Sequence, residues 1–320
     1  ANNSEKAFDE NDIKYWMPVD QYVGGIEHAI LHLLYSRFFM RAISLKNKIT
    51  NIKEPFKGLF TQGMVCHQTY KDKNNKWLNP EEVFSHDGKV FYVKGEPESK
   101  VLVGPSESMS KSKKNTVDPE KMIHSYGADS VRLFILSDSP PEKDIQWSES
   151  GMSSASKYVQ KFWLMNKKIF TVLKKEKIKS NDEINIFTNQ AIEKINYALE
   201  RFRYNVIIAV FHEIYGFFNR IAEKQENYKN LESNYKKILI VMMPVIPHIV
   251  SECLEKISNK DGVIWPKIEK KFIENEKTNI VIQVNGKKRA LISTEKNSNE
   301  NSIIKQIKEM KLIEKYLKDK

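Results

Sequence analysis

Residues 108–115 of this chain read SMSKSKKN, a run of lysines and hydroxyl side chains with one large apolar residue, Met109. Such a run does not serve a hydrophobic core, so it is either solvated or in contact with an anion. Lysine ammonium groups act as adjustable point charges for polyphosphate, and serine hydroxyls donate hydrogen bonds to the same oxygens. The stretch therefore predicts a phosphate-binding loop, and an ordinary basic surface loop is the alternative when the lysines are taken alone.

The residues that follow the loop favour the phosphate-binding interpretation. Asp118 and Pro119 are typical of a helix N-cap and a first helical residue, and Gly127 is typical of the end of that short helix. Asp129 is expected to cap a second helix over residues 130–136. The loop is thus expected to lie between rigid elements.

The loop resembles the Lys-Met-Ser-Lys-Ser signature of the class I aminoacyl-tRNA synthetases. A second stretch, residues 15–39, reads YWMPVDQYVGGIEHAILHLLYSRFF and is similar to the leucyl-tRNA synthetases of bacterial and organellar type, rather than to the isoleucyl, valyl or methionyl enzymes. The resemblance extends along nearly the whole chain, through Gln62–Val65, Tyr126–Asp129, Trp147–Gly151, Pro247–His248 and Val284–Lys287. Ser108 departs from the signature, whose first residue is a lysine.

The resemblance implies a fold that is α/β plus all-α, in three parts. Residues 1–150 are the expected second half of a Rossmann-like class I catalytic domain, residues 151–266 a helical-bundle anticodon-binding domain, and residues 267–320 a linker and an incomplete small α/β C-terminal domain that contacts tRNA. The resemblance also implies that the first half of the nucleotide-binding fold and the editing domain precede this chain. We therefore expect a segment of a longer synthetase or the smaller chain of a split enzyme, inactive by itself.

Residue patterns agree with this division. Apolar residues recur at helical spacing from residue 152 onward, which predicts a bundle of four or five helices. The stripes are Tyr158, Phe162, Met165 and Ile169; Val206, Val210, Ile214, Phe217 and Ile221; and Ile238, Val241 and Met242. Asp87-Gly88 predicts a hairpin within residues 84–92, and residues 94–100 read as a polar connector. Asn285-Gly286 predicts a second hairpin between strands 279–284 and 287–292, followed by a helix near residues 303–310.

The N-terminal stretch predicts a strand at residues 21–23, a tight turn at Gly24-Gly25 and a long helix from Ile26 onward. The apolar stripe of that helix is Ile30, Leu34, Phe38 and Ala42. Glycines at such a turn let a ligand approach backbone amides, although structural glycines are as common there. Glu27, His28 and His32 are expected on one flank of the helix, where a pair of core histidines is the alternative interpretation. No third ligand of suitable spacing is evident, so no zinc site is predicted.

The resemblance implies ligation of leucine to leucine tRNA through an ATP-dependent leucyl-adenylate, with ATP entering as its Mg²⁺ complex. Lys111 is the expected catalytic residue, in contact with the departing pyrophosphate, and Lys113 or Lys114 is expected to share the task of the lysine that Ser108 replaces. Glu27 is expected to hold the ribose, His28 to lie near the phosphates, and His32 and Tyr22 to bind leucine. The full ATP-binding set is Met109, Ser110, Lys111, Ser112, Gly24, Gly25, Glu27, His28 and Met64.

A stand-alone tRNA- or RNA-binding module without aminoacylation activity is the alternative function. Ser108 and the missing half of the catalytic core favour it. Lys111, Glu27 and His32 argue against it, because a binding module has no need for a reagent loop and a ribose clamp.

Composition is consistent with an RNA partner. The 320 residues carry a net charge of +11, which favours a polyanion, and Lys167, Lys168, Lys174, Lys175 and Lys177 form either an RNA-binding face or a solvated one. The two cysteines, Cys66 and Cys253, lack the spacing of a disulfide framework or a zinc site, which points to the reducing cytoplasm. No apolar run approaches membrane-spanning length.

Overall fold

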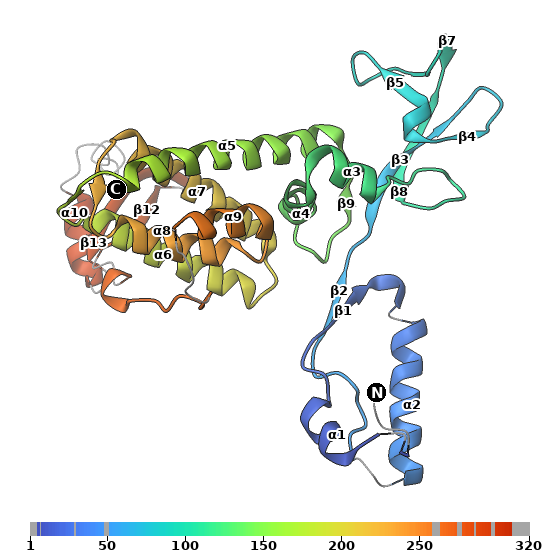
Figure 1. Ribbon diagram of the computed structural model, residues 1–320, viewed down its shortest axis with the longest axis horizontal. Coiled ribbons are helices and arrows are strands. Elements are labelled where there is room, and N and C mark those ends of the chain that lie inside the picture. The colour runs from blue at the N-terminus through green and yellow to red at the C-terminus, as the bar shows by residue number, and fades with distance from the viewer. Residues whose placement is uncertain are drawn as a thin grey trace.

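The structure of the chain, a computed structural model, describes residues 5–6, 8–28, 30–47, 51–257, 263–273, 277–284, 286–295 and 298–308. Its parts follow one another as an N-terminal α/β unit, a β unit, two connecting helices and a helical bundle with a small hairpin at its end (Figure 1). This order matches the expected combination of an α/β part with an all-α part.

The N-terminal unit consists of α1 (Glu10–Trp16), β1 (Tyr22–Gly25), the 3₁₀ helix η1 (Ile26–His28), α2 (Leu31–Asn47) and β2 (Leu59–Gln62). β1 and β2 pair in parallel, and their hydrogen-bonded register runs from Tyr22 opposite Leu59 to Gly25 opposite Gln62. The predicted turn at Gly24-Gly25 is therefore wrong, because pairing with β2 keeps both glycines extended. The chain turns at η1 instead, and the long helix begins at Leu31 rather than Ile26.

The apolar stripe of α2 faces solvent in this chain. Ile30, just before the helix, and Leu34 and Phe38 within it are 75%, 59% and 70% exposed, whereas the neighbouring Leu33 is buried. The two-stranded sheet β1–β2 has too little surface to cover a second face of a 17-residue helix. The stripe is thus an uncovered apolar surface.

The β unit is built around β3 (Val65–Lys71), which lies between β4 (Trp77–Leu78) and β8 (Leu102–Ser108) in antiparallel pairing. β9 (Ile145–Gln146) joins the start of β3 in parallel. η2 (Pro80–Glu82) then leads into a second, three-stranded sheet.

That second sheet consists of β5 (Val83–Ser85), β6 (Phe91–Val93) and β7 (Glu96–Lys100). The predicted hairpin is confirmed: Phe84 pairs with Tyr92, and Gly88 has a positive φ of 70°. Residues 94–100 are more than a connector, since most of them form β7, which pairs with β6.

The loop leads into α3 (Pro119–Tyr126) and α4 (Ala128–Ser137). As predicted, Asp118 caps α3 by accepting the N–H of Glu120 at 3.0 Å, and α3 ends at Gly127, whose φ is 83°. The prediction that Asp129 caps α4 is wrong, because α4 begins at Ala128 and Asp129 already lies in its first turn. The Asp129 carboxylate instead accepts the N–H groups of His248 at 3.2 Å and Ile249 at 2.7 Å, at the start of α9.

The helical bundle contains five described helices: α5 (Glu149–Leu173), α6 (Asp182–Leu199), α7 (Tyr204–Glu223), α8 (Leu231–Met242) and α9 (Pro247–Ile257). The predicted stripes meet in one core, with the exception of Val206, which is exposed near the start of α7. Buried Tyr235 donates to Asn166 Oδ1 at 2.5 Å, and burial raises the pKa of this phenol well above its ordinary value. The short strands β10 (Lys177–Ile178) and β11 (Asn227–Tyr228) join two inter-helix loops.

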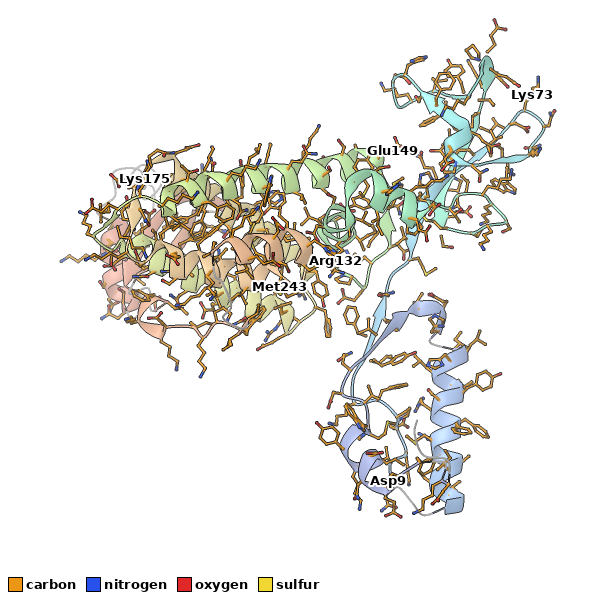
Figure 2. All side chains as sticks on the ribbon, viewed as in Figure 1. Asp9, Lys73, Arg132, Glu149, Lys175 and Met243 are labelled. Carbon is orange, nitrogen blue, oxygen red and sulfur yellow. The ribbon has the colours of Figure 1, made fainter. Side chains whose placement is uncertain are left out.

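Arg132 joins α4 to the bundle at the turn between α8 and α9. Its guanidinium donates to the carbonyls of Val245 at 2.9 Å and Pro244 at 2.7 Å, close to Met243 (Figure 2). Trp147 packs edge-on against Phe134 of α4, with ring centroids 5.1 Å apart. The bundle is thus fixed to the segment that follows the loop.

After η3 (Lys270–Phe272), the described part of the chain continues in an antiparallel hairpin of β12 (Lys277–Val284) and β13 (Lys287–Glu295), followed by α10 (Glu300–Lys308). This confirms the two predicted strands and the helix up to Lys308. Gly286 has a φ of 73°, as a primed turn requires, while Asn285 and residues 309–310 lie outside the described residues. Among the described residues, none of the helices combines the length and the apolarity that crossing a bilayer requires.

We expect Asp129→Ala to lower the free energy of unfolding by about 1–3 kcal/mol, because two N–H groups at the start of α9 lose their acceptor. Urea denaturation followed by tryptophan fluorescence measures the change. Asp138→Ala, at the exposed end of the same helix, is the control and is expected to stay within about 0.5 kcal/mol. If the two variants are equally stable, the Asp129 carboxylate does not stabilise the start of α9.

Candidate functional site

The loop of residues 108–115, which we call the signature loop, is closed at its base by Asn115. This side chain is fully buried, at 0% exposure. Its Oδ1 accepts the N–H of Ser110 at 2.8 Å, and its Nδ2 donates to the carbonyls of His67 and Glu107 at 3.2 Å and of Ser108 at 3.4 Å. One amide therefore fastens both ends of the loop to β3 and β8.

Within the loop, hydroxyl groups and a strained backbone set the path of the chain. The Oγ atoms of Ser110 and Ser112 lie 3.2 Å apart, and Ser110 Oγ also accepts the N–H of Lys113 at 3.3 Å. Lys114 has a φ of 54°, in the left-handed region that few non-glycine residues adopt. The loop is thus a compact turn whose serines lie together beside the lysines.

The three lysines of the loop differ in their partners. Lys113 Nζ forms an ion pair with Glu107, and Lys114 Nζ lies 4.0 Å from Glu82 Oε2. Lys111 is exposed and forms no ion pair in the part of the chain that the structure describes. It is therefore the lysine of this loop that is available to an external anion. The expectation that Lys113 or Lys114 shares the task of the lysine that Ser108 replaces meets two competing carboxylates.

A second group of predicted site residues lies on β1, η1 and α2. Tyr22, Gly24 and Gly25 are in β1, where Gly25 is buried. Glu27 and His28 follow on η1, with 3.7 Å between Glu27 Oε1 and His28 Nε2. His32, in the first turn of α2, has its ring centroid 6.4 Å from that of His28 and 5.5 Å from that of Tyr22. The structure thus brings the predicted ribose and leucine residues together with His28, but not with the signature loop. Glu27 and His28 lie on η1, whereas His32 lies on α2, so the three residues do not share one flank of a single helix as was expected.

Gly25 leaves the space that the Glu27 carboxylate occupies. A Cβ atom at position 25 would lie only 2.3 to 2.5 Å from the three carboxylate atoms of Glu27. A side chain at this position would therefore displace the carboxylate from the end of β1.

Met64 links the two groups along the chain. It lies between β2 and β3, where its N–H donates to Asp144 Oδ1 at 2.8 Å and its carbonyl accepts the N–H of Ile145 at 2.8 Å. The preceding Gly63 packs against the backbone of Lys143, since a Cβ there would lie 2.3 Å from the carbonyl carbon. The β1 group and the signature loop are two separate clusters in this chain, at the two ends of this β2–β3 connection (Figure 1).

The basic face predicted on the bundle is largely engaged with other side chains. Lys168 lies 3.9 Å from Glu223, Lys177 lies 3.1 Å from Glu232, and Lys175 donates to the Gln225 carbonyl at 2.9 Å. Lys167 lies over the Trp163 ring at 5.6 Å. These contacts favour the interpretation as a solvated, internally paired face.

Sequence reasoning missed the parts played by Glu82, Glu107 and Asn115. Asn115 is the last residue of the signature loop, but nothing in the sequence indicates that its side chain is buried. The two glutamates come from a helix 32 residues before Lys114 and from a strand 6 residues before Lys113, so only the folded chain brings them together. Within the described ranges, no group of three or more His, Cys, Asp or Glu side chains is arranged to hold a metal ion.

Comparison with known proteins finds two matching families and several similar ligases. Residues 99–148 match the family "tRNA synthetases class I (I, L, M and V)", and residues 181–305 match "Anticodon-binding domain of tRNA ligase". The leucine–tRNA ligase of Rickettsia canadensis is 40% identical over 88% of this chain and 34% of that protein. That of Rickettsia massiliae is 37% identical over 100% of this chain and 38% of that protein.

The chain is a homologue of the leucine–tRNA ligases. This confirms the resemblance inferred from residues 15–39 and from the signature loop. The homologue spans about 38% of the length of the curated relatives that it matches. Its fold is also that of a solved leucyl enzyme, the Agrobacterium radiobacter K84 agnB2 LeuRS in a ternary complex with tRNA and LeuAMS. The TM-score is 0.68 at 24% identity, over 94% of this chain and 35% of that one.

We expect Asn115→Ala to lower the free energy of unfolding by about 1–3 kcal/mol, because it leaves the Ser110 N–H and three carbonyls without their partner. Amide exchange at Ser110, measured by hydrogen–deuterium exchange, should accelerate as well. Asn115→Asp tests whether the donor side of the amide is needed. It keeps an acceptor for Ser110 but places a carboxylate against three carbonyl oxygens, so it should be no more stable than Asn115→Ala. Unchanged exchange at Ser110 in both variants contradicts the role of this amide.

Proposed function

We propose that this chain supplies the ATP-binding loop and the tRNA-binding helices of an enzyme that ligates leucine to leucine tRNA. The observation that carries the proposal is the signature loop. Its base is fixed by buried Asn115, its serine hydroxyls lie together, and Lys111 is exposed without an ion-pair partner in the described chain. Homology to leucine–tRNA ligases along the whole chain supports the choice of reaction.

The first step of this reaction is an in-line attack of the leucine carboxylate on the α-phosphorus of ATP, which forms leucyl-adenylate and releases pyrophosphate. Negative charge builds on the bridging and pyrophosphate oxygens, so positioning and cations contribute more than proton transfer. Lys111 stabilises the departing pyrophosphate, while Met109, Ser110 and Ser112 complete the contact of the loop with ATP. ATP enters as its Mg²⁺ complex, with the ion carried on the phosphates of the substrate. In the second step, a hydroxyl of the terminal ribose of the tRNA attacks the leucyl carbonyl carbon, an ester forms, and the acyl–phosphate bond breaks to release AMP.

The group on β1, η1 and α2, which is a separate cluster from the signature loop in this chain, meets the loop across ATP in the assembled enzyme and binds the remainder of the substrates. Glu27 accepts hydrogen bonds from the ribose hydroxyls and His28 lies beside the phosphates, a division supported by their 3.7 Å contact at the end of β1. Gly24, Gly25 and Met64 border the adenine. His32 and Tyr22, whose rings are 5.5 Å apart, line the leucine site.

The uncovered apolar surface of α2 binds the part of the ligase that this chain does not match. Beside it, Ile30, Leu34 and Phe56 line an open groove of about 470 Å³ together with Arg37 and Glu54. Hydrogen bonds from Arg37 and Arg41 lower the pKa of Glu54 to about 2, so the groove carries a fixed ion pair within an apolar rim. A patch of this kind is typical of a protein interface. The partner is therefore the remaining catalytic and editing part, in the same polypeptide or as a separate chain.

The bundle and the C-terminal hairpin bind tRNA in this proposal, with residues 1–150, 151–266 and 267–320 as the catalytic, anticodon-binding and C-terminal parts. The match of residues 181–305 to an anticodon-binding family supports the assignment of the bundle. We place the enzyme in the cytoplasm because both cysteines are unpaired and buried.

We expect Lys111→Ala to reduce leucine-dependent ATP–pyrophosphate exchange by about 10²- to 10³-fold, the usual effect of removing one group that stabilises a transition-state charge. The assay combines this chain with the unmatched part of the Rickettsia massiliae ligase, and the chain alone should show no exchange. Lys113→Ala is the comparison and should lose less than about tenfold, because the ion pair with Glu107 that Lys113 must give up offsets part of its contact with the phosphates. Tight tRNA binding without exchange in any combination would instead support a tRNA-binding module.

We expect Phe38→Asp to abolish this complementation by placing a carboxylate in the apolar surface of α2. Since Phe38 is exposed in the chain alone, the thermal unfolding midpoint of the chain should not change. Leu164→Asp, at an exposed leucine of α5, is the matched control and should leave exchange intact. If Phe38→Asp complements as well as the parent chain, this surface is not the interface.

A further inference from the structure

Two glutamates form ion pairs with Lys113 and Lys114, the two lysines of the signature loop that lie nearest to α3 in the sequence. Glu107, near the end of β8, pairs with Lys113, and Glu82, at the end of η2, lies 4.0 Å from Lys114. In each pair the lysine and the glutamate are about one-third to one-half exposed, so solvent and competing ions reach both contacts. Two of the three positive charges of the loop are therefore held by the protein itself.

Glu82 is held in place by its own capping interactions. Its Oε2 accepts the N–H of Asn79 at 2.7 Å and Asn79 Nδ2 at 3.0 Å, which forms a capping box around η2. The Asn79 backbone hydrogen bond, and then the charge of Lys114, lower the pKa of this carboxyl, so it is ionised at neutral pH. The carboxylate is thus a fixed negative charge rather than a mobile surface group.

Glu81, next to Glu82, ties the same turn to the element that follows the loop. Its Oε1 accepts Lys121 Nζ at 2.7 Å, on the first turns of α3. The η2 turn therefore makes two contacts, one with Lys114 inside the loop and one with Lys121 in α3, the helix that follows the loop. Because Glu81 and Glu82 share one backbone turn, they offer a matched pair of variants that separates a contact with the loop from a contact with α3.

Lys114 connects this pairing to the shape of the loop. Its φ of 54° places a lysine where glycine is favoured, and its N–H donates to the Lys111 carbonyl at 3.3 Å. The side chain held by Glu82 and the backbone that returns the loop beside Lys111 belong to the same residue. Release of this side chain therefore frees the turn that positions Lys111.

We propose that Glu82 and Glu107 form an acidic latch that holds the signature loop in a closed-off arrangement, in which Lys113 and Lys114 are neutralised and Lys111 alone is presented to a polyphosphate. The polyphosphate displaces the carboxylates and then recruits the two released lysines. Glu82 is a positioning residue that acts through Lys114. The choice of ATP as the physiological polyphosphate rests on the proposed function, whereas the latch itself does not.

The strength of these pairs suits a latch that opens. Exposed ion pairs shift an equilibrium by no more than about fivefold, and salt screens them. A polyphosphate carries several negative charges and accepts charge-assisted hydrogen bonds from more than one lysine, so it outcompetes a single carboxylate. The loop therefore stays ordered without ligand and remains available to it.

The first test is hydrogen–deuterium exchange of the 320-residue chain over residues 109–114. Glu82→Gln keeps an oxygen acceptor for Asn79 but removes the charge, and it should accelerate exchange about two- to fivefold. Glu81→Gln, which loses only the Lys121 contact, is the matched control and should match the parent chain. Added salt should bring the parent chain toward the Glu82→Gln rate. Equal exchange in the parent and in Glu82→Gln overturns the latch.

The second test is calorimetric titration of the same chains with inorganic tripolyphosphate. Glu82→Gln and Glu107→Gln should each bind it about two- to fivefold more tightly than the parent chain, and Lys114→Gly should cancel the gain from Glu82→Gln because Glu82 then holds no lysine to release. Unchanged or weaker binding by Glu82→Gln overturns the latch, as does the absence of binding by every chain. If both tests succeed while the assembled enzyme lacks leucine-dependent exchange, the latch stands and the proposed function fails.

Discussion

The carboxylate of Asp129 holds the N-terminus of α9 and so joins that helix to α4, whose Leu133 and Phe134 lie in the core of the bundle. Both of its oxygens accept N–H groups of α9, which otherwise lack a helical acceptor. Arg132, one turn further along α4, donates to the carbonyls that end the preceding turn. One helix thus satisfies the donors of one segment and the acceptors of another, so α4 cannot rotate against the bundle without breaking both sets. Since α4 follows α3 and α3 follows the signature loop, the bundle and the loop share one rigid connection.

At the other end of that connection, Asn115 does for the loop what Asp129 does for the bundle. Its amide meets backbone groups of β3, of β8 and of the loop itself, in an environment without solvent. Unsatisfied backbone groups at such a place are costly, so the base of the loop has one stable arrangement. The tip, by contrast, is held by exposed ion pairs that are individually weak. The loop therefore combines a fixed base with a releasable tip, as a binding loop requires.

Features encoded by neighbouring residues were predictable from the sequence, and features that depend on distant residues were not. The Asp118 cap, the Asp87-Gly88 hairpin and the helical stripes are local patterns, and the structure confirms them apart from Val206. Asp129 has the local appearance of an N-cap, but its partners lie 119 and 120 residues away. Gly24 and Gly25 look like a turn until β2 pairs with them. The candidate site residues were predicted through family resemblance, whereas the carboxylates that oppose the lysines were visible only once the chain was folded.

Charge in this protein is informative through its distribution rather than its total. A net charge of +11 suggests a polyanion partner, yet on the bundle Lys168, Lys175 and Lys177 are engaged with neighbouring side chains or carbonyls. The same holds for two of the three lysines in the signature loop, and Ser108 stands where the family signature has a further lysine, a substitution that no contact in the structure explains. What distinguishes Lys111 is therefore not its charge, which many residues share, but that it has no ion-pair partner within the described chain, in a loop whose base is fixed by buried Asn115. An anion approaching this loop meets a single preorganised cation first, and the remaining positive charge becomes available only in exchange for two carboxylates.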